Sequence, residues 1–273
     1  MFSFKNLAIY ITLSLSPLIL LAQKVTEGKS INTSYQSGEQ VTYLISYTWF
    51  CLWTDVGEVT FKVTNETKDG KYVLHLKCTG STYPFYDWFF KVRDLYESWI
   101  DPSTQQPVHF NRAINEGGFT KENEYQFDWS KDQVFVRVRR KSNPSKYNTL
   151  KIEKNTYDVI SAIYAARNFN YSNIKPDKIF PITAIFDKEI YKVGYKFLGR
   201  EEKQIKGIGK LNCLKFQVDL VVGDIFANNQ KLYVWVTDDQ NHIPAIIESP
   251  IKIGSIKARV TSWTGLRNKA SFN

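Results

Sequence analysis

Apolar and polar residues alternate with a period of two along most of this chain, and this pattern constrains its fold more than any other feature. Val41, Tyr43, Ile45 and Tyr47 begin it, and it recurs at 59–63, 72–78, 108–110, 125–129, 134–138, 191–197, 214–222, 232–236 and 256–260. Successive side chains of a strand point to opposite faces, so the pattern predicts a series of β-strands with one apolar face.

The connections between these segments are short and rich in Gly, Asn, Asp and Pro. Asp69-Gly70, for example, predicts a tight hairpin. Short connections favour an antiparallel meander over β-α-β units. About a dozen strands are too many for a flat open sheet. We therefore predict a mainly β fold, a large antiparallel meander sheet curled into an open barrel or a two-sheet sandwich.

One mid-chain segment, at 155–169, has helical rather than alternating periodicity. Val159, Ile160, Ile163 and Tyr164 share one side of a helix that Asn155 or Thr156 would cap. We expect this helix to cover an open end or the concave face of the sheet. Residues 23–273 then form a single β-rich domain, or two β halves joined by the helix.

The segment TYPFYDWFF at 82–90 predicts a second, short helix, with Pro84 in its first turn. Its large apolar side chains are packed together as nowhere else in the chain. The favoured interpretation is a plug in the core; the alternative is an exposed lip of a cavity or a docking surface. In the alternative, the residues that contact a hydrophobic ligand or a partner are Phe85, Tyr86, Trp88, Phe89 and Phe90.

The N-terminal residues predict export. Lys5 precedes an apolar run at 7–21, and Ala22 precedes a polar stretch, which is the order of a signal peptide at 1–22. The run is short and interrupted by Pro17, so it is a poor membrane span. We expect the mature chain in the periplasm or another extracytoplasmic space, without a transmembrane segment after cleavage.

The chain has three cysteines, Cys51, Cys78 and Cys213. An odd number in an exported protein leaves a free thiol or an intermolecular bridge, and Cys51 could pair with Cys78. The favoured interpretation is that all three are small buried apolar residues.

The formal net charge of +9 would suit nucleic acid, an anionic membrane surface or an acidic polymer. Export argues against nucleic acid and leaves a lipid or another envelope component. Arg137, Arg139 and Lys141 share one face of a predicted strand. A solvated face or protection of a sheet edge explains them, and contact with anionic lipid or polysaccharide is the alternative. Nothing in the sequence indicates an oligomeric state.

Of all the segments in this sequence, LYVWVTDDQNHIP at 232–244 most resembles a metal or acid–base site. Asp238, Asp239 and His242 have the composition of a hairpin turn. A hard cation or zinc would need further ligands, for which His75 or His109 would have to approach. The sequence contains no GxSxG, HExxH or phosphate-binding loop and no GxGxxG after a strand. We therefore predict a non-catalytic protein without catalytic, cofactor-binding or metal-ligating residues.

Several segments, in this order, resemble one family. They are GEQVTYLISY (38–47), GEVTF (57–61), DLYESWID (94–101), YDVISAIYAAR (157–167), GKLNCLKF (209–216), VWVTDDQNHIP (234–244) and IGSI (253–256). The chain is similar over nearly its whole mature length to the domain of unknown function 3108 family of exported bacterial proteins. The resemblance implies no activity and no catalytic residues. The sequence departs from the family at 49–57, WFCLWTDVG, where the family has smaller residues and a bulkier loop is expected here.

Three functions follow as hypotheses. The aromatic share of 15% and the cluster at 82–90 favour binding of a hydrophobic or lipid-like envelope ligand. The alternatives are a structural or interaction module of the cell envelope and an envelope hydrolase that uses carboxylates.

Overall fold

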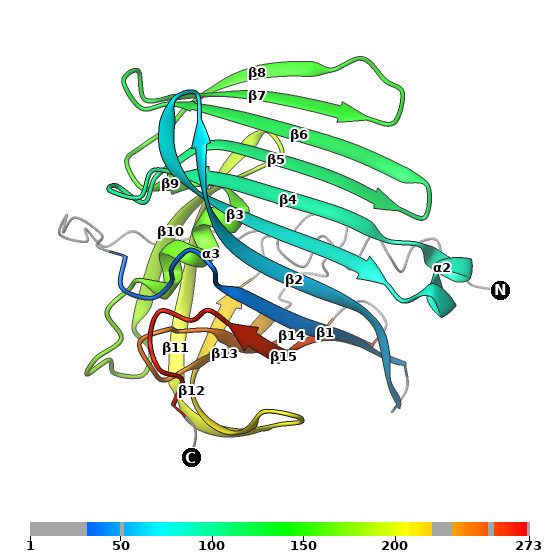
Figure 1. Ribbon diagram of the computed structural model, residues 1–273, viewed down its shortest axis with the longest axis vertical. Helices are drawn as coiled ribbons and strands as arrows, with labels where there is room; N and C mark the ends of the chain where they lie inside the picture. Colours follow the sequence, from blue (N-terminus) through cyan, green and yellow to red (C-terminus); the bar gives the residue numbers. More distant parts are fainter. Residues whose placement is uncertain (1–31, 50–51, 220–230, 251–253, 272–273) are drawn as a thin grey trace.

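The computed structural model describes residues 32–49, 52–219, 231–250 and 254–271. The predicted signal peptide and Cys51 lie outside these residues. Within the described residues, fifteen strands form one sheet that curls without closing, so the predicted mainly β meander is confirmed (Figure 1).

Neighbouring strands of the sheet are consecutive in the chain except at the centre, where β1 pairs with β15. Its order is β8-β7-β6-β5-β4-β3-β2-β1-β15-β14-β13-β12-β11-β10-β9, so the first and last long strands pair at the centre. Every pairing is antiparallel except that of β9 with β10. The strands are β1 (Gln40–Trp49), β2 (Leu52–Lys68), β3 (Lys71–Thr82), β4 (Arg93–Ile100), β5 (Pro107–Glu116), β6 (Phe119–Asp128), β7 (Gln133–Arg140), β8 (Lys146–Lys151), β9 (Thr156–Tyr157), β10 (Ile179–Phe186), β11 (Glu189–Ile205), β12 (Gly209–Asp219), β13 (Lys231–Thr237), β14 (Pro244–Pro250) and β15 (Ser255–Thr264).

The hairpin predicted at Asp69-Gly70 is confirmed. Both residues have positive φ, 52° and 74°, and Lys68 pairs with Lys71 across the turn. Only Gly adopts that conformation without steric strain, and Asp tolerates it, so the dipeptide determines the turn. The loop expected at 49–57 is not a loop over most of its length, because β2 begins at Leu52.

Helix α3 (Val159–Arg167) lies inside the curl (Figure 1). It contacts β3 and β4 from one half of the sheet and β10 from the other. The helix predicted at 155–169 is therefore present, but its predicted start is wrong. Thr156 and Tyr157 form β9, and Asp158 rather than Asn155 or Thr156 is the N-cap.

The N-cap explains where α3 begins. The Asp158 carboxylate accepts hydrogen bonds from the backbone N–H of Ile160 (2.9 Å) and of Ser161 (3.0 Å), while the Ser161 hydroxyl accepts one from the Asp158 N–H (3.0 Å). This reciprocal capping box satisfies donors that the first helical turn leaves free. The Ser98 hydroxyl on β4 also donates to the Asp158 carboxylate, at 2.6 Å, which ties the helix start to the sheet.

Most of the buried apolar side chains belong to two clusters. One cluster joins strands β2–β7 with Ile160 and Tyr164 of α3, and a second joins β1 with β11–β15. On β7, Arg137 and Arg139 instead pair with Glu124 and Glu122 of β6, which is the predicted solvated face. The edge strand is β8, not β7. No helix in the described part of the chain is long and apolar enough to span a membrane.

Candidate functional site

A cavity of about 340 Å³ lies between α3 and the concave face of the sheet. Strands from both halves contribute to its wall, which is mostly apolar. Among the lining residues are Val41, Tyr43, Ile45, Val59, Phe61, Ile163, Tyr164, Ile182, Phe216, Val234 and Ile256. This is the arrangement in which a curled sheet encloses an apolar ligand.

Small side chains at inward positions leave this space open. Ala162 and Ala166 on α3, Ala184 on β10 and Ala258 on β15 all line the cavity. Larger residues at these positions would fill the gap between the helix and the sheet, because protein interiors are otherwise close-packed. The period-two pattern of the strands therefore makes the cavity wall apolar, and the alanines leave space between the helix and the sheet.

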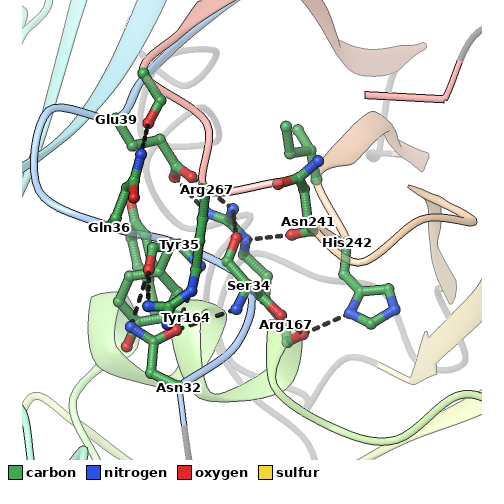
Figure 2. Close-up of polar contacts among 12 residues, drawn as sticks. Asn32, Ser34, Tyr35, Gln36, Glu39, Tyr164, Arg167, Asn241, His242 and Arg267 are labelled. Carbon is green, nitrogen blue, oxygen red and sulfur yellow. Dashed lines mark hydrogen bonds and ion pairs between the residues drawn. The ribbon is translucent and has the colours of Figure 1, made fainter. Parts of the chain in front are cut away.

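Arg167, at the end of α3, lies in the cavity wall and joins three parts of the chain (Figure 2). Its guanidinium makes a bidentate ion pair with Glu39, at 2.6 and 2.8 Å, and both side chains are buried. It also donates to the backbone oxygens of Asn241 (2.9 Å) and Ser34 (3.0 Å). Burial alone would lower the pKa of Arg167, but the Glu39 carboxylate outweighs it and raises that pKa. These contacts tie the end of α3 to the N-terminal segment and to Asn241, and Arg167 stays charged.

A second polar group lies on the inner face of β4 and β5. Asp94 and Tyr96 line the cavity, and Arg112 and Glu116 are buried beside them on the next strand. Burial raises the pKa of Asp94 to about 7. Burial, and then the charge of Asp94, raise the pKa of Glu116 to about 8. The two carboxyl groups therefore retain a proton near neutral pH, as like charges in one apolar site do.

Asp187, in the turn between β10 and β11, fastens that turn to the opposite half of the sheet. Its carboxylate accepts hydrogen bonds from Lys121, from Arg112 (3.3 Å) and from Asn123 (3.3 Å). The Tyr125 hydroxyl donates to the Asp187 backbone oxygen at 3.1 Å. Although burial alone would raise the pKa of Asp187, the neighbouring cations lower it. These contacts tie the β10–β11 turn to β5 and β6 in the other half of the sheet.

Residues 42–261 match the model of a family described as "Protein of unknown function (DUF3108)". The chain belongs to the DUF3108 family. The resemblance drawn from the sequence is confirmed. No curated protein matches this DUF3108 chain.

A solved structure shares the fold of this DUF3108 protein. It is the crystal structure of a β-barrel-like protein of domain of unknown function DUF1849 from Brucella abortus, with a TM-score of 0.52 and 7% sequence identity. The similarity covers 82% of this chain and 96% of that chain. At this identity the likeness establishes the architecture alone.

The segments that resemble the family motifs have structural explanations in this DUF3108 chain. In the helix segment, Asp158 and Ser161 form the capping box and Arg167 pairs with Glu39. In the segment VWVTDDQNHIP, the Asp239 carboxylate accepts from the backbone N–H of Asn241, at 2.9 Å, and from the Thr237 hydroxyl, at 2.9 Å. Such contacts maintain a hairpin turn, as predicted.

The remaining polar residues of that hairpin also have structural partners. Asp238 pairs with Arg200 at 2.8 Å, and the ring nitrogen Nδ1 of His242 contacts the Arg167 backbone oxygen at 2.6 Å. His75 and His109 lie beside Trp99 instead. Across residues 32–49, 52–219, 231–250 and 254–271, no three His, Cys, Asp or Glu side chains are grouped as metal ligands would be. Cys78 and Cys213 are free and buried, as expected of small apolar residues.

The aromatic segment forms helix α2 (Pro84–Phe90), as predicted, but it is not a core plug. Phe85 is 73% exposed, Trp88 83% and Phe89 52%, and α2 has no buried residue. The described cavity wall includes Ser81, Thr82 and Val92 on either side of α2, but none of Phe85, Tyr86, Trp88, Phe89 and Phe90. The aromatic helix thus lies at the end of β3, outside the curl (Figure 1).

Sequence reasoning missed the polar residues of the interior. Arg112 and Glu116 occupy the same phase of β5 as the buried Phe110 and Ile114. A charged residue in the inward phase of an alternating strand is the signal that could have revealed them, since buried charges need partners.

Proposed function

We propose that this protein is exported and binds a hydrophobic, lipid-like component of the cell envelope without transforming it. The cavity between α3 and the sheet carries the proposal. Its volume of about 340 Å³ falls within the range of roughly 300–1,000 Å³ that small-molecule sites have. Its apolar walls suit an acyl chain better than a sugar or a nucleotide, whose polar groups would lose water without compensation.

Binding of a fluorescent fatty-acyl probe to delipidated protein tests the proposal. We expect uptake, and competition by unlabelled lipids whose affinity rises about threefold to fourfold per added methylene until the cavity is full, because each buried methylene contributes about 0.8 kcal/mol.

A matched pair of variants locates the probe. Ala162 lines the cavity, and Ala113 is exposed on β5. Ala162→Phe should abolish uptake by filling the space, and Ala113→Phe should leave it unchanged. Equal affinities in the two variants would show that the probe binds elsewhere, and a delipidated protein that takes up no probe would refute lipid binding.

The exposure of α2 favours a second candidate, an interaction module of the cell envelope. Trp88 and Phe85 present a large apolar surface to solvent, which suits a protein partner. Crosslinking in the native envelope separates the two functions. A stoichiometric protein partner that is lost on Trp88→Ser but retained on Ala162→Phe would favour the interaction module. A co-purifying lipid that is lost on Ala162→Phe but retained on Trp88→Ser would favour lipid binding in the cavity.

A further inference from the structure

The wall of the cavity is mostly apolar, and its polar residues include Asp94 and Tyr96 on the inner face of β4. Tyr96 and Asp94 both line the cavity, with exposures of only 4% and 7%. The Asp94 carboxyl hydrogen-bonds to the Glu116 carboxyl through the proton that the pair retains. The Tyr96 hydroxyl has no hydrogen-bond partner among the residues that the structure describes. A buried polar atom in this state is unfavourable, because it has lost its hydrogen bonds to water and gained none in the protein. Such atoms at a cavity surface indicate a polar group that completes them.

The next strand adds one more unpartnered atom, on Arg112. Arg112 pairs directly with Tyr96 in the sheet register, and its guanidinium lies over the Tyr96 ring, 5.4 Å from the ring centre. Arg112 Nε is likewise unpartnered within the described ranges, and Glu116 shares its hydrogen bond with Asp94. Together, Asp94, Tyr96, Arg112 and Glu116 form a group of donors and acceptors, here called the polar cluster.

The charges around the polar cluster balance. Arg112 and Lys121 are the buried cations, and Asp187 accepts from both. Asp94 and Glu116 supply one further negative charge, because their raised pKa values keep one proton on the pair near neutral pH. Arg140, 3.9 Å from Asp187, is 60% exposed and is compensated by solvent. An ionic ligand would bring a buried charge without a partner, whereas a neutral head that donates and accepts hydrogen bonds would not.

We propose that the polar cluster is the head-group subsite of the cavity and takes the uncharged, hydroxyl- or amide-bearing head of an amphiphile whose chain lies along the apolar wall. The inference rests on the proposed lipid-binding function and specifies its ligand. The Tyr96 hydroxyl donates to the head, and the Asp94 carboxyl accepts from it.

Three ligands with the same acyl chain test the head-group preference: monolauroylglycerol, methyl laurate and laurate. At neutral pH we expect monolauroylglycerol to bind about tenfold more tightly than methyl laurate, because methyl laurate has no head-group hydroxyl that could accept from Tyr96 or donate to Asp94. Laurate should bind more weakly than monolauroylglycerol, because its anion would be buried beside a cluster that already carries balanced charge.

A pair of tyrosine variants separates a ligand contact from a structural one. Tyr96→Phe should weaken monolauroylglycerol about tenfold, leave methyl laurate unchanged within about twofold, and keep or raise the melting temperature, since it removes a buried hydroxyl without a bond. Tyr125, also buried, donates to Asp187 and lies outside the cavity wall. Tyr125→Phe should lower the melting temperature and leave the ratio of the two affinities unchanged. Asp94→Asn, which retains the shape of the side chain, should weaken monolauroylglycerol as Tyr96→Phe does.

The outcomes distinguish the two proposals. Equal affinities for monolauroylglycerol and methyl laurate, or tighter binding of laurate, would overturn the head-group subsite and leave the apolar cavity as a binding site. A loss of both ligands on Tyr96→Phe would also overturn the subsite, because it would indicate a disrupted fold. Failure of all three ligands to bind the wild-type protein would overturn lipid binding and the subsite with it.

Discussion

At the scale of single residues, the interior of this protein is organised by a few charged side chains. Glu39 and Arg167 are separated by 128 positions in the chain and form a buried bidentate pair. Bidentate geometry and further bonds to backbone oxygens are what allow such a pair to be buried. The pair stabilises the native arrangement because its loss would leave one charge alone in an apolar site.

The first prediction concerns this pair. Arg167→Met should lower the free energy of unfolding by about 3–5 kcal/mol, since it leaves Glu39 buried without its partner. Arg200 pairs with Asp238 but is about half exposed, so Arg200→Met should change stability by less than about 1 kcal/mol. Urea denaturation followed by circular dichroism measures both. Similar losses in the two variants would contradict the role assigned to burial.

The second prediction concerns pH. The carboxyl pKa of Glu116 is about 8 in the folded protein, against an ordinary value of about 4.3 in the unfolded chain. A raised pKa means that the folded state binds the extra proton, so this stabilisation is complete below the unfolded value and is lost as pH rises through the folded value. The wild type should therefore lose stability relative to Glu116→Gln between about pH 5 and pH 9, by on the order of a few kcal/mol.

Denaturant titrations of the wild type and of Glu116→Gln at several pH values measure this difference, because the other titrating groups are common to both. Parallel stability curves would show that the Glu116 carboxyl does not hold its proton. Asp94→Asn with Glu116→Gln should remove the dependence more completely, since both acids beside Arg112 and Lys121 are then neutral.

At the scale of elements, helix α2 shows that apolar composition does not determine burial. Its rings contact one another, as Trp88 and Phe89 do with ring centres 4.5 Å apart, rather than entering the core. Phe90 packs against Gly117, where a side chain would collide with the ring. The helix is therefore anchored at one end and presents its other aromatic side chains to solvent.

The third prediction follows from this exposure. Trp88→Ser should change the free energy of unfolding by no more than about 0.5 kcal/mol, as is usual for surface positions. Phe110, 1% exposed in the core, is the control; Phe110→Ala should cost about 3–5 kcal/mol. Thermal unfolding compares them, and a large loss on Trp88→Ser would mean that α2 packs as a plug after all.

At the scale of the whole molecule, two joints hold the curl over the cavity. Arg167 connects α3 to the N-terminal segment and the β13–β14 turn, and Asp187 connects the β10–β11 turn to β5 and β6. These joints involve side chains far apart in sequence.

The fourth prediction is that Asp187→Asn loosens one joint. Losing the charge leaves Lys121 and Arg112 buried without their anion. Hydrogen exchange measured by mass spectrometry should increase at the β10–β11 turn and along β5–β7, and remain unchanged in β13–β15. A uniform increase across the sheet would show that the joint governs global stability instead of local closure.

The sequence predicted the parts of this fold that depend on local periodicity. Alternation located most strands, and the Asp69-Gly70 turn and both helices were found. The start of α3 was missed because Thr156 and Tyr157 pair with β10, a contact that no local pattern encodes. An apolar cavity was expected, but the polar cluster was missed: Tyr96 and Arg112 meet through the pairing of β4 with β5, and Asp187 reaches Arg112 only when the sheet curls.

The sheet ends in two strands, β8 and β9, that do not hydrogen-bond to each other anywhere in the described chain. In a closed barrel the strand number and stagger set the diameter. In this open sheet, contacts between side chains set the diameter instead. The interior can therefore widen without breaking backbone hydrogen bonds between strands. On the proposed lipid-binding function, branched and unbranched acyl chains should therefore bind with similar strength.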